Sequence, residues 1–265
     1  MNILDTIVAH KRKEVAARME SAPTSILEKR PLFQQPIISL KKRLLEENSS
    51  GIIAEFKRQS PSKGVINSTA LADATTLQYV QAGASGLSVL TDRQFFGGSE
   101  QDFLSARRAN GNTPMLRKDF VVSEYQIIEA RSIGADVILL IAACLDPATV
   151  TALSAFAHRL GMEVLLEVHN EEELLQNLRS DADLVGVNNR NLKTFEVDIN
   201  LSRKLFPLIP KDAVKVSESG IEKAETIREL RETGFRGFLM GQRFMEQSNP
   251  GQACQAFIET LRNGK

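Results

Sequence analysis

From Gly51 onward, short apolar runs alternate with longer stretches in which apolar positions recur at helical spacing. Apolar runs of about four to eight residues are typical of buried strands, and the longer stretches are typical of amphipathic helices. The alternation predicts parallel β/α units. The predicted strands are Ile52–Lys57, Gly86–Thr91, Pro114–Asp119, Ala135–Ala142, Glu163–Val168, Leu184–Asn188, Ala213–Ser217 and Gly237–Gly241.

The helical stretches between these strands begin near Thr69, Glu100, Ser123, Pro147, Glu171, Leu201, Glu222 and Pro250. Several end in a glycine just before the next strand, which suits the left-handed position that stops a helix. Eight units in about 215 residues predict an α/β fold, the (β/α)8 TIM barrel. A doubly wound sheet usually has fewer strands and a Gly-x-Gly-x-x-Gly turn after the first, and this sequence has no such turn there.

Residues 1–50 predict an N-terminal helical extension. Its first helix carries an apolar stripe, and a second helix is predicted over Ser39–Glu47. We interpret the basic run Lys11-Arg12-Lys13 as a solvent-exposed helix face. Because no low-complexity linker follows, we predict that residues 1–265 form a single barrel domain with the extension packed on it. The apolar stripe consists of Ile3, Leu4, Ile7, Val8 and Val15.

The composition of the chain argues against several classes of partner and site. Lys and Arg together number 33, as do Asp and Glu, so no bulk positive charge favours nucleic acid or an anionic membrane as a partner. No apolar run is long enough to span a bilayer and the N-terminus does not resemble a signal peptide, so we expect a cytoplasmic protein. The two cysteines and three histidines are too scattered to indicate a zinc site or a disulfide framework.

Charged and amide side chains collect at the ends of five predicted strands. In a barrel these ends meet at one rim, where active sites lie. Glu55 and Lys57 share one face of the first strand, and taken alone they indicate a structural ion pair as readily as catalysis. Convergence from five strands favours catalysis. The other strand-end groups are Lys118, Glu167, Asn188, Arg190, Glu218 and Ser219.

Glycines after the last two strands indicate an anion site. Gly220 follows the seventh predicted strand and Gly241 ends the eighth. Glycine lets backbone N–H groups approach an anion, and the loops after strands seven and eight commonly bind phosphate in barrels. Either glycine alone could simply form a turn, but the pair favours phosphate. Ser60, in the loop after the first strand, would border this site.

Several motifs in register resemble the indole-3-glycerol phosphate synthase family. They cover nearly the whole chain and lie at the expected strand ends, which makes them far more specific than one short pattern. The motifs are Glu55-Phe56-Lys57-Arg58 with Ser60-Pro61-Ser62, Leu90-Thr91-Asp92, Phe95-Phe96-Gly97-Gly98, Leu116-Arg117-Lys118-Asp119-Phe120, Gly186-Val187-Asn188-Asn189-Arg190-Asn191-Leu192 and Ser217-Glu218-Ser219-Gly220-Ile221.

The resemblance implies ring closure of 1-(2-carboxyphenylamino)-1-deoxyribulose 5-phosphate, with loss of carbon dioxide and water, to give indole-3-glycerol phosphate. It implies a carboxy-lyase of tryptophan biosynthesis that needs no cofactor and no metal. Lys118 would protonate the ketone oxygen. Glu55, Lys57 and Glu167 would share the later proton transfers, in a division that the sequence does not fix. As an acid, a lysine works better with a lowered pKa; burial in a dry pocket would lower it and carboxylates in the same pocket would raise it, so the sequence leaves the direction open.

The resemblance also assigns binding roles. Asn188, Arg190 and Ser219 would orient sugar hydroxyls and the substrate carboxylate, while Glu218 would position a lysine. An apolar wall for the aromatic ring and the phosphate site complete the set. The wall would be Pro61, Phe96, Phe120, Leu139 and Leu192, and the phosphate site would be Ser60, Gly220, Gly241 and Gln242. The chain departs from the family pattern at Gln242-Arg243, where small or acidic residues are more usual.

Two other readings stay open at this point. Another phosphate-binding barrel, such as an isomerase or a Schiff-base aldolase, would use one strand-end lysine covalently. A non-catalytic sugar-phosphate binding barrel would be expected to lose part of the acid and base set, which is complete here. For partners we expect a small phosphorylated substrate, no nucleic acid and no membrane. We expect a monomer, and a weak association with other tryptophan-pathway enzymes stays open.

Overall fold

Eight parallel strands close into a barrel in the order β1-β10-β9-β8-β7-β6-β5-β4, which confirms the predicted TIM barrel. The computed structural model describes residues 3–192 and 194–263. Most predicted strand ends differ from the observed ones by one or two residues. The barrel strands are β1 (Ile52–Phe56), β4 (Gly86–Leu90), β5 (Met115–Lys118), β6 (Val137–Ile141), β7 (Glu163–Val168), β8 (Leu184–Asn188), β9 (Val214–Glu218) and β10 (Gly237–Met240).

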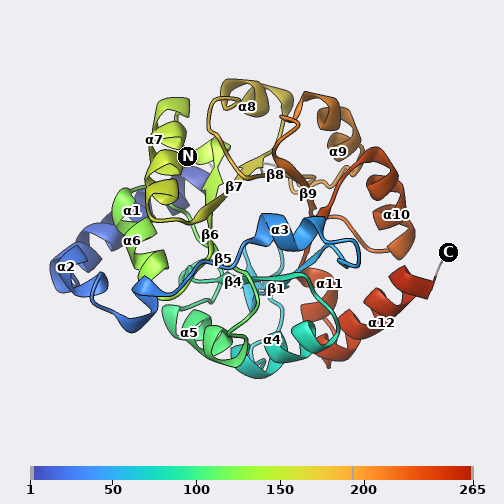
Figure 1. Ribbon diagram of the computed structural model, residues 1–265, viewed down its shortest axis with the longest axis horizontal. Helices are drawn as coiled ribbons and strands as arrows, with labels where there is room; N and C mark the ends of the chain where they lie inside the picture. The colour runs from blue at the N-terminus through green and yellow to red at the C-terminus, as the bar shows by residue number, and fades with distance from the viewer. Residues whose placement is uncertain (1–2, 193, 264–265) are drawn as a thin grey trace.

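Helices surround the strands as an outer ring (Figure 1). Two predicted helix starts, Thr69 and Glu222, were two or three residues too early. In the first case the Asn67 side chain accepts a hydrogen bond from the backbone N of Ala70, a turn that delays the helix. The ring consists of α4 (Ala72–Gln81), α5 (Glu100–Ala109), α6 (Glu124–Ser132), α7 (Pro147–Arg159), α8 (Glu171–Gln176), α9 (Asn200–Leu205), α10 (Ala224–Thr233) and α12 (Pro250–Asn263).

Several short elements were not predicted, because each has too few residues for a periodic pattern. The most relevant to function are a hairpin in the loop after β1 and a one-turn helix after β10. These are β2 (Gln59–Ser60) with β3 (Gly64–Val65), and α11 (Gln242–Met245). The others are α2 (Thr24–Leu27), η1 (Pro31–Gln34), η2 (Ala142–Cys144) and η3 (Phe206–Leu208).

The side chains of β1 point alternately into two layers of the core. Ile52, Ala54 and Phe56 belong to the apolar layer between strands and helices. Ile53 belongs to a second cluster that fills the barrel interior, together with Leu165 of β7. Side chains of a strand alternate between these layers, so Glu55 follows Ile53 toward the interior. Its position on the inner face agrees with the sequence pattern.

The helix α3 (Leu40–Leu45) covers the end of the barrel where the strands begin, and it lies across the ring in Figure 1. Leu40 and Leu44 are buried against the interior cluster. Glu163, the first residue of β7, accepts hydrogen bonds from the backbone N of Leu40 at 2.8 Å and of Lys41 at 3.0 Å. These bonds satisfy free N–H groups of the helix and hold it in place. The helix α3 therefore closes the end of the barrel where the strands begin. An active site is expected at the opposite end.

The first helix, α1 (Ile3–Ser21), corrects one interpretation of the sequence. Arg12 and Lys13 are exposed as expected, but Lys11 is buried, with 1 % of its side chain exposed. Its Nζ lies 2.9 Å from Asp92 Oδ2 and 2.9 Å from Asp119 Oδ1. A buried ammonium is tolerated when paired carboxylates surround it. The partners lie far along the chain, so local spacing could not reveal them.

Through this cluster α1 is tied to residues that follow β4 and β5. It also contacts α6 and η2. These contacts place the N-terminal helices against the barrel, and the assignment of the whole chain to a single domain stays a prediction. None of the helices within residues 3–192 and 194–263 is both long and apolar enough to cross a membrane.

Candidate active site

A cavity of about 880 Å³ opens where the barrel strands end. Pockets for small ligands usually have this size. Every site residue that the sequence indicated lines it, although the role of each stays a prediction. Those residues are Glu55, Lys57, Ser60, Pro61, Phe96, Lys118, Phe120, Leu139, Glu167, Asn188, Arg190, Leu192, Glu218, Ser219, Gly220, Gly241 and Gln242.

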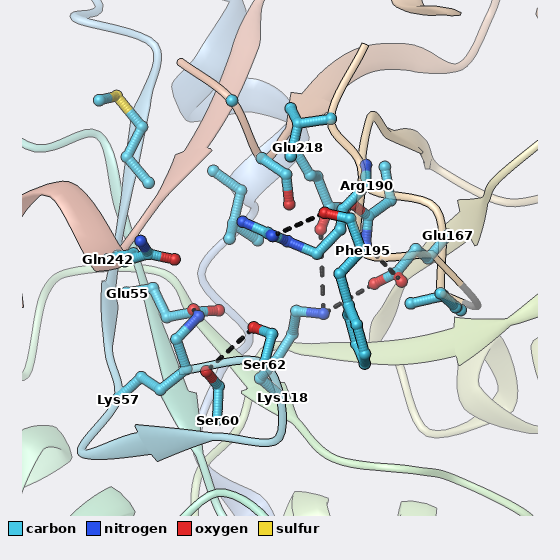
Figure 2. A pocket seen from close by; sticks show the side chains of 18 of the residues that line it. Glu55, Lys57, Ser60, Ser62, Lys118, Glu167, Arg190, Phe195, Glu218 and Gln242 are labelled. Carbon is cyan, nitrogen blue, oxygen red and sulfur yellow. Dashed lines mark hydrogen bonds and ion pairs between the residues drawn. The ribbon is translucent and has the colours of Figure 1, made fainter. Parts of the chain in front are cut away.

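Lys118, at the end of β5, lies between two carboxylates. Its Nζ is 2.7 Å from Glu167 Oε2 on β7 and 3.8 Å from Glu218 Oε2 on β9. Figure 2 shows the ammonium pointing toward both. Asn188, at the end of β8, donates a hydrogen bond of 3.0 Å to Glu167 Oε1. Side chains from four strands thus meet around one cation.

The three ionisable groups of this cluster, Lys118, Glu167 and Glu218, differ in protonation. Burial disfavours the ammonium of Lys118, but the nearby carboxylates, Glu167 foremost, outweigh it and raise its pKa above the usual value. Burial also disfavours the charged form of Glu167, but Lys118 and His169 outweigh the effect of burial and lower the pKa of Glu167. Burial and the Glu167 charge raise the pKa of Glu218 to about 8. At neutral pH the cluster therefore holds a cation, an anion and a carboxyl group that is mostly protonated.

A close approach of two strands explains the placement of Glu218. One of its oxygens, Oε1, is buried without a hydrogen-bond partner among the described residues. A Cβ on Gly186 of β8 would lie 2.1 Å from this oxygen, so only glycine leaves room for it. A buried carboxyl oxygen without a partner from the protein is costly, and Oε1 lies in the cavity region where a ligand group could meet it.

A second ion pair faces the same cavity from β1. Lys57 Nζ lies 2.6 Å from Glu55 Oε1, and Ser88 of β4 donates a hydrogen bond of 3.3 Å to Glu55 Oε2. The structural and the catalytic readings of this pair are compatible, because the two groups are paired and both line the cavity. A Cβ on Gly241 would lie 2.8 Å from Glu55 Oε1. Substitution of Gly241 would therefore disturb Glu55 as well as any bound anion.

The two glycine loops lie on neighbouring strands, since β9 pairs with β10. Ser219 has a φ of 66° and Gly220 a φ of 76°, so two consecutive residues adopt the left-handed conformation. This conformation is rare for serine and is concentrated at functional sites. Arg243 lines the cavity on this side too, next to Gln242 at the start of α11. Glycine at positions 220 and 241 leaves room for an anion to approach the backbone N–H groups of these loops.

Aromatic and aliphatic side chains form an apolar wall of the cavity. The rings of Phe96 and Phe120 are tilted against each other with their centroids 5.9 Å apart. The sequence missed part of this wall, namely Ile3, Leu4 and Ile7 of α1, although all three belong to the predicted apolar stripe. It also missed Phe195, whose backbone O accepts a hydrogen bond of 3.2 Å from Arg190 (Figure 2).

The wall and the polar groups together suit an aromatic ring that carries charged substituents. No group of three or more His, Cys, Asp or Glu in residues 3–192 and 194–263 is arranged to hold a metal ion.

Comparison with known proteins gives a consistent result. A family model described as indole-3-glycerol phosphate synthase matches residues 4–257. Two relatives carry the same name. The protein from Bacteroides thetaiotaomicron is 45 % identical over 261 residues, covering 98 % of this chain and 99 % of the relative. The protein from Chromobacterium violaceum is 46 % identical over 257 residues, covering 95 % and 96 %.

Solved structures with much lower identity share the fold. Thiamine phosphate pyrophosphorylase from Pyrococcus furiosus has a TM-score of 0.60 at 14 % identity and covers 84 % of this chain and 98 % of its own. The 3-hexulose-6-phosphate synthase from Salmonella typhimurium has a TM-score of 0.62 at 11 % identity, with coverages of 81 % and 99 %. At these identities the likeness concerns the barrel alone.

Proposed function

The chain belongs to the indole-3-glycerol phosphate synthase family, and we infer that it is the enzyme that closes the indole ring in tryptophan biosynthesis. It converts 1-(2-carboxyphenylamino)-1-deoxyribulose 5-phosphate to indole-3-glycerol phosphate, carbon dioxide and water, which makes it a carboxy-lyase. The observation that supports this chemistry most is the cluster of Lys118 with Glu167 and Glu218, which lines the same cavity as the two glycine loops.

Lys118 is the acid of the ring closure. When the aryl carbon attacks the ketone, negative charge develops on the ketone oxygen and must be neutralised. The raised pKa keeps Lys118 fully protonated at neutral pH, so the proton is always available. The raised pKa also weakens Lys118 as an acid in the free enzyme. Transfer becomes favourable only where the developing oxyanion is the stronger base, and this condition is met in the transition state.

We assign the later proton transfers to Glu167 and Glu218, whereas the resemblance gave them to Glu55, Lys57 and Glu167 and made Glu218 a residue that positions a lysine. Dehydration needs an acid at the departing hydroxyl and a base for the remaining proton. The lowered pKa of Glu167 fits an ionised base, and the pKa of about 8 fits Glu218 as a carboxyl group that still carries a proton. Carboxyl groups whose surroundings push their pKa values apart are typical of such a division of roles.

Binding of the substrate uses the rest of the cavity. Lys57 neutralises the substrate carboxylate until it leaves as carbon dioxide, with Glu55 holding the ammonium in place. Ser60, Gly220, Gly241 and Gln242 surround the phosphate, and the aromatic ring packs on Phe96 and Phe120. Asn188, Arg190 and Ser219 orient the remaining polar groups of the sugar. We propose that the chain acts as a cytoplasmic monomer on this small phosphorylated substrate.

The proposed function is tested by mixing the purified chain with its substrate in buffer that contains a metal chelator and no nucleotide. We expect indole fluorescence to appear with one carbon dioxide released per indole formed. A lysine adduct that borohydride can trap, or consumption of substrate without an indole product, would contradict the proposal and favour a different barrel chemistry.

A further inference from the structure

We propose that His169 is a positioning residue of this reaction. It contacts Glu167 and keeps its carboxylate beside Lys118, and Glu173 in turn holds the His169 ring in place. The proposal rests on the proposed function, because it assigns His169 a part in the proton transfers of Glu167. His169 follows β7 directly and is not among the residues that line the cavity. It therefore acts on the reaction only through Glu167.

The imidazole of His169 lies between two carboxylates. Its Nε2 is 3.0 Å from Glu167 Oε1, and its Nδ1 is 3.2 Å from Glu173 Oε2. Only 7 % of the side chain is exposed. Nε2 has no other partner among the described residues, and its contact with Glu167 is an ion contact rather than a well-aligned hydrogen bond. The ring is thus held by Glu173, with its Nε2 beside Glu167.

Glu173 is rigid because it belongs to the cap of α8. The Asn170 side chain accepts a hydrogen bond of 2.8 Å from the backbone N of Glu173 and donates one of 2.7 Å to its Oε1. Glu173 Oε2 in turn accepts a hydrogen bond of 2.8 Å from the backbone N of His169. This reciprocal arrangement has the spacing of a capping box, but Glu173 accepts from the backbone N of the residue before the N-cap and from the N-cap side chain. It transmits the fixed position of the helix start to the histidine ring.

Both ring nitrogens face carboxylates, so the ring needs two N–H groups, which only the imidazolium form provides. Burial disfavours that form, but Glu167 and Glu173 outweigh it and raise the pKa of His169 to about 9. The other ionisable groups in this region are Lys118, Glu218, Asp5 and the Cys144 thiol. Burial and nearby carboxylates raise the pKa of that thiol to about 12, so it stays neutral.

The charge of His169 has a consequence for the reaction cycle. Glu167 contacts Lys118 through Oε2 and His169 and Asn188 through Oε1. When Lys118 has given its proton to the substrate, one of the two cations beside Glu167 is gone. His169 then remains to keep Glu167 ionised and in position until Lys118 is protonated again. Without the imidazolium, the pKa of Glu167 would rise and its carboxylate would be less constrained.

The first test measures the contact of His169 with Glu167 and Glu173 in the free enzyme, without substrate. The chain has only three histidines, so their ring signals can be followed by NMR during a pH titration. We expect one ring with a pKa near 9 that disappears in His169→Leu, and we expect its pKa to fall by about one unit or more in Glu173→Gln and in Glu167→Gln. A His169 pKa that is ordinary, or that ignores both substitutions, would overturn the proposal even if the enzyme is fully active.

The second test is kinetic. His169→Gln keeps a neutral N–H group near the place of Nε2, and His169→Leu removes it. We expect kcat to fall about threefold in the first variant and about tenfold in the second, with little change in KM. Because loss of the imidazolium raises the pKa of Glu167, the acid limb of the kcat profile should move to higher pH in both. A uniform loss with an unmoved profile would indicate a merely structural role and contradict the proposal.

His158 provides the matched control. Its Nε2 also lies beside a carboxylate, 2.9 Å from Asp183 Oδ2, and it does not line the cavity. We expect His158→Gln to leave kcat and its pH profile unchanged, since this pair lies away from Glu167. An effect as large as that of His169→Gln would show that loss of any histidine–carboxylate contact suffices, which would overturn the specific role of His169.

Discussion

Replacing Lys118 by Met is expected to lower kcat by about a thousandfold while the affinity for the product changes far less. Met keeps most of the volume of the lysine stem but cannot donate a proton. The oxyanion that forms during ring closure would then be left without its acid. Glu167 and Glu218 would also face each other without the cation between them, so their pKa values would rise and the base would be partly neutralised.

Single-turnover measurements with the substrate, together with titration of the product, separate the two effects. The control is Lys215→Met, the same change near the beginning of β9, where the ammonium donates a 2.7 Å hydrogen bond to the backbone O of Pro210 at the other end of the barrel. We expect that variant to turn over normally. Near-normal turnover of Lys118→Met would remove Lys118 from its role as the acid.

Glu167→Gln should have the second largest effect, a loss in kcat of about a hundredfold. Gln is nearly isosteric and can still bond to Asn188, so the cavity should keep its shape while the base is lost. The pKa of Lys118 should fall because its main neutralising charge is gone. Lys118 would then lose its proton at a lower pH, and the alkaline limb of the kcat profile should move down.

The pH dependence of kcat checks this expectation. Glu172→Gln is the matched control, because Glu172 carries the same charge on α8 but is exposed to solvent. That variant should match the parent enzyme in rate and in profile. If Glu167→Gln slowed the reaction while its alkaline limb stayed where it is in the parent, Glu167 would not be the group that holds Lys118 in its charged state.

The barrel could be predicted because its strands carry a local signal. Apolar runs such as Leu184–Asn188 are bounded by polar residues on both sides, and their spacing repeats eight times. The site followed from the fold, since a polar residue at the end of such a run is placed at the rim by the topology alone. The positions of Gly220 and Gly241 at this rim could be predicted for the same reason, because each lies just after the end of a strand.

The remaining features depend on contacts between distant residues or on unusual backbone conformations. Lys11 looks like an exposed residue because Asp92 and Asp119, which neutralise it, are far away along the chain. Ser219 carries no sequence mark of its positive φ. His169 is a different case, because the spacing of Asn170 and Glu173 is that of a capping box and could have drawn attention to it.

The direction of the pKa shift of Lys118 also lay beyond the sequence. Burial lowers the pKa of a lysine and nearby carboxylates raise it, so the outcome depends on distances. In the folded chain two carboxylates lie within 4 Å of the ammonium, and they prevail over burial. A residue pattern indicates that such groups meet, but the balance between them follows only from the geometry.

The most direct test of the central claim, that Lys118 and Glu167 work as one unit, is a double-mutant cycle on kcat/KM. If they form one proton-transfer unit, combining Lys118→Met with Glu167→Gln should cost hardly more than Lys118→Met alone, because Glu167 then has no ammonium to hold in its charged form and ring closure is already blocked before Glu167 acts as a base. We expect the double variant to lie within about threefold of that single variant. Full multiplication of the two losses would show that the residues act independently and would contradict the claim.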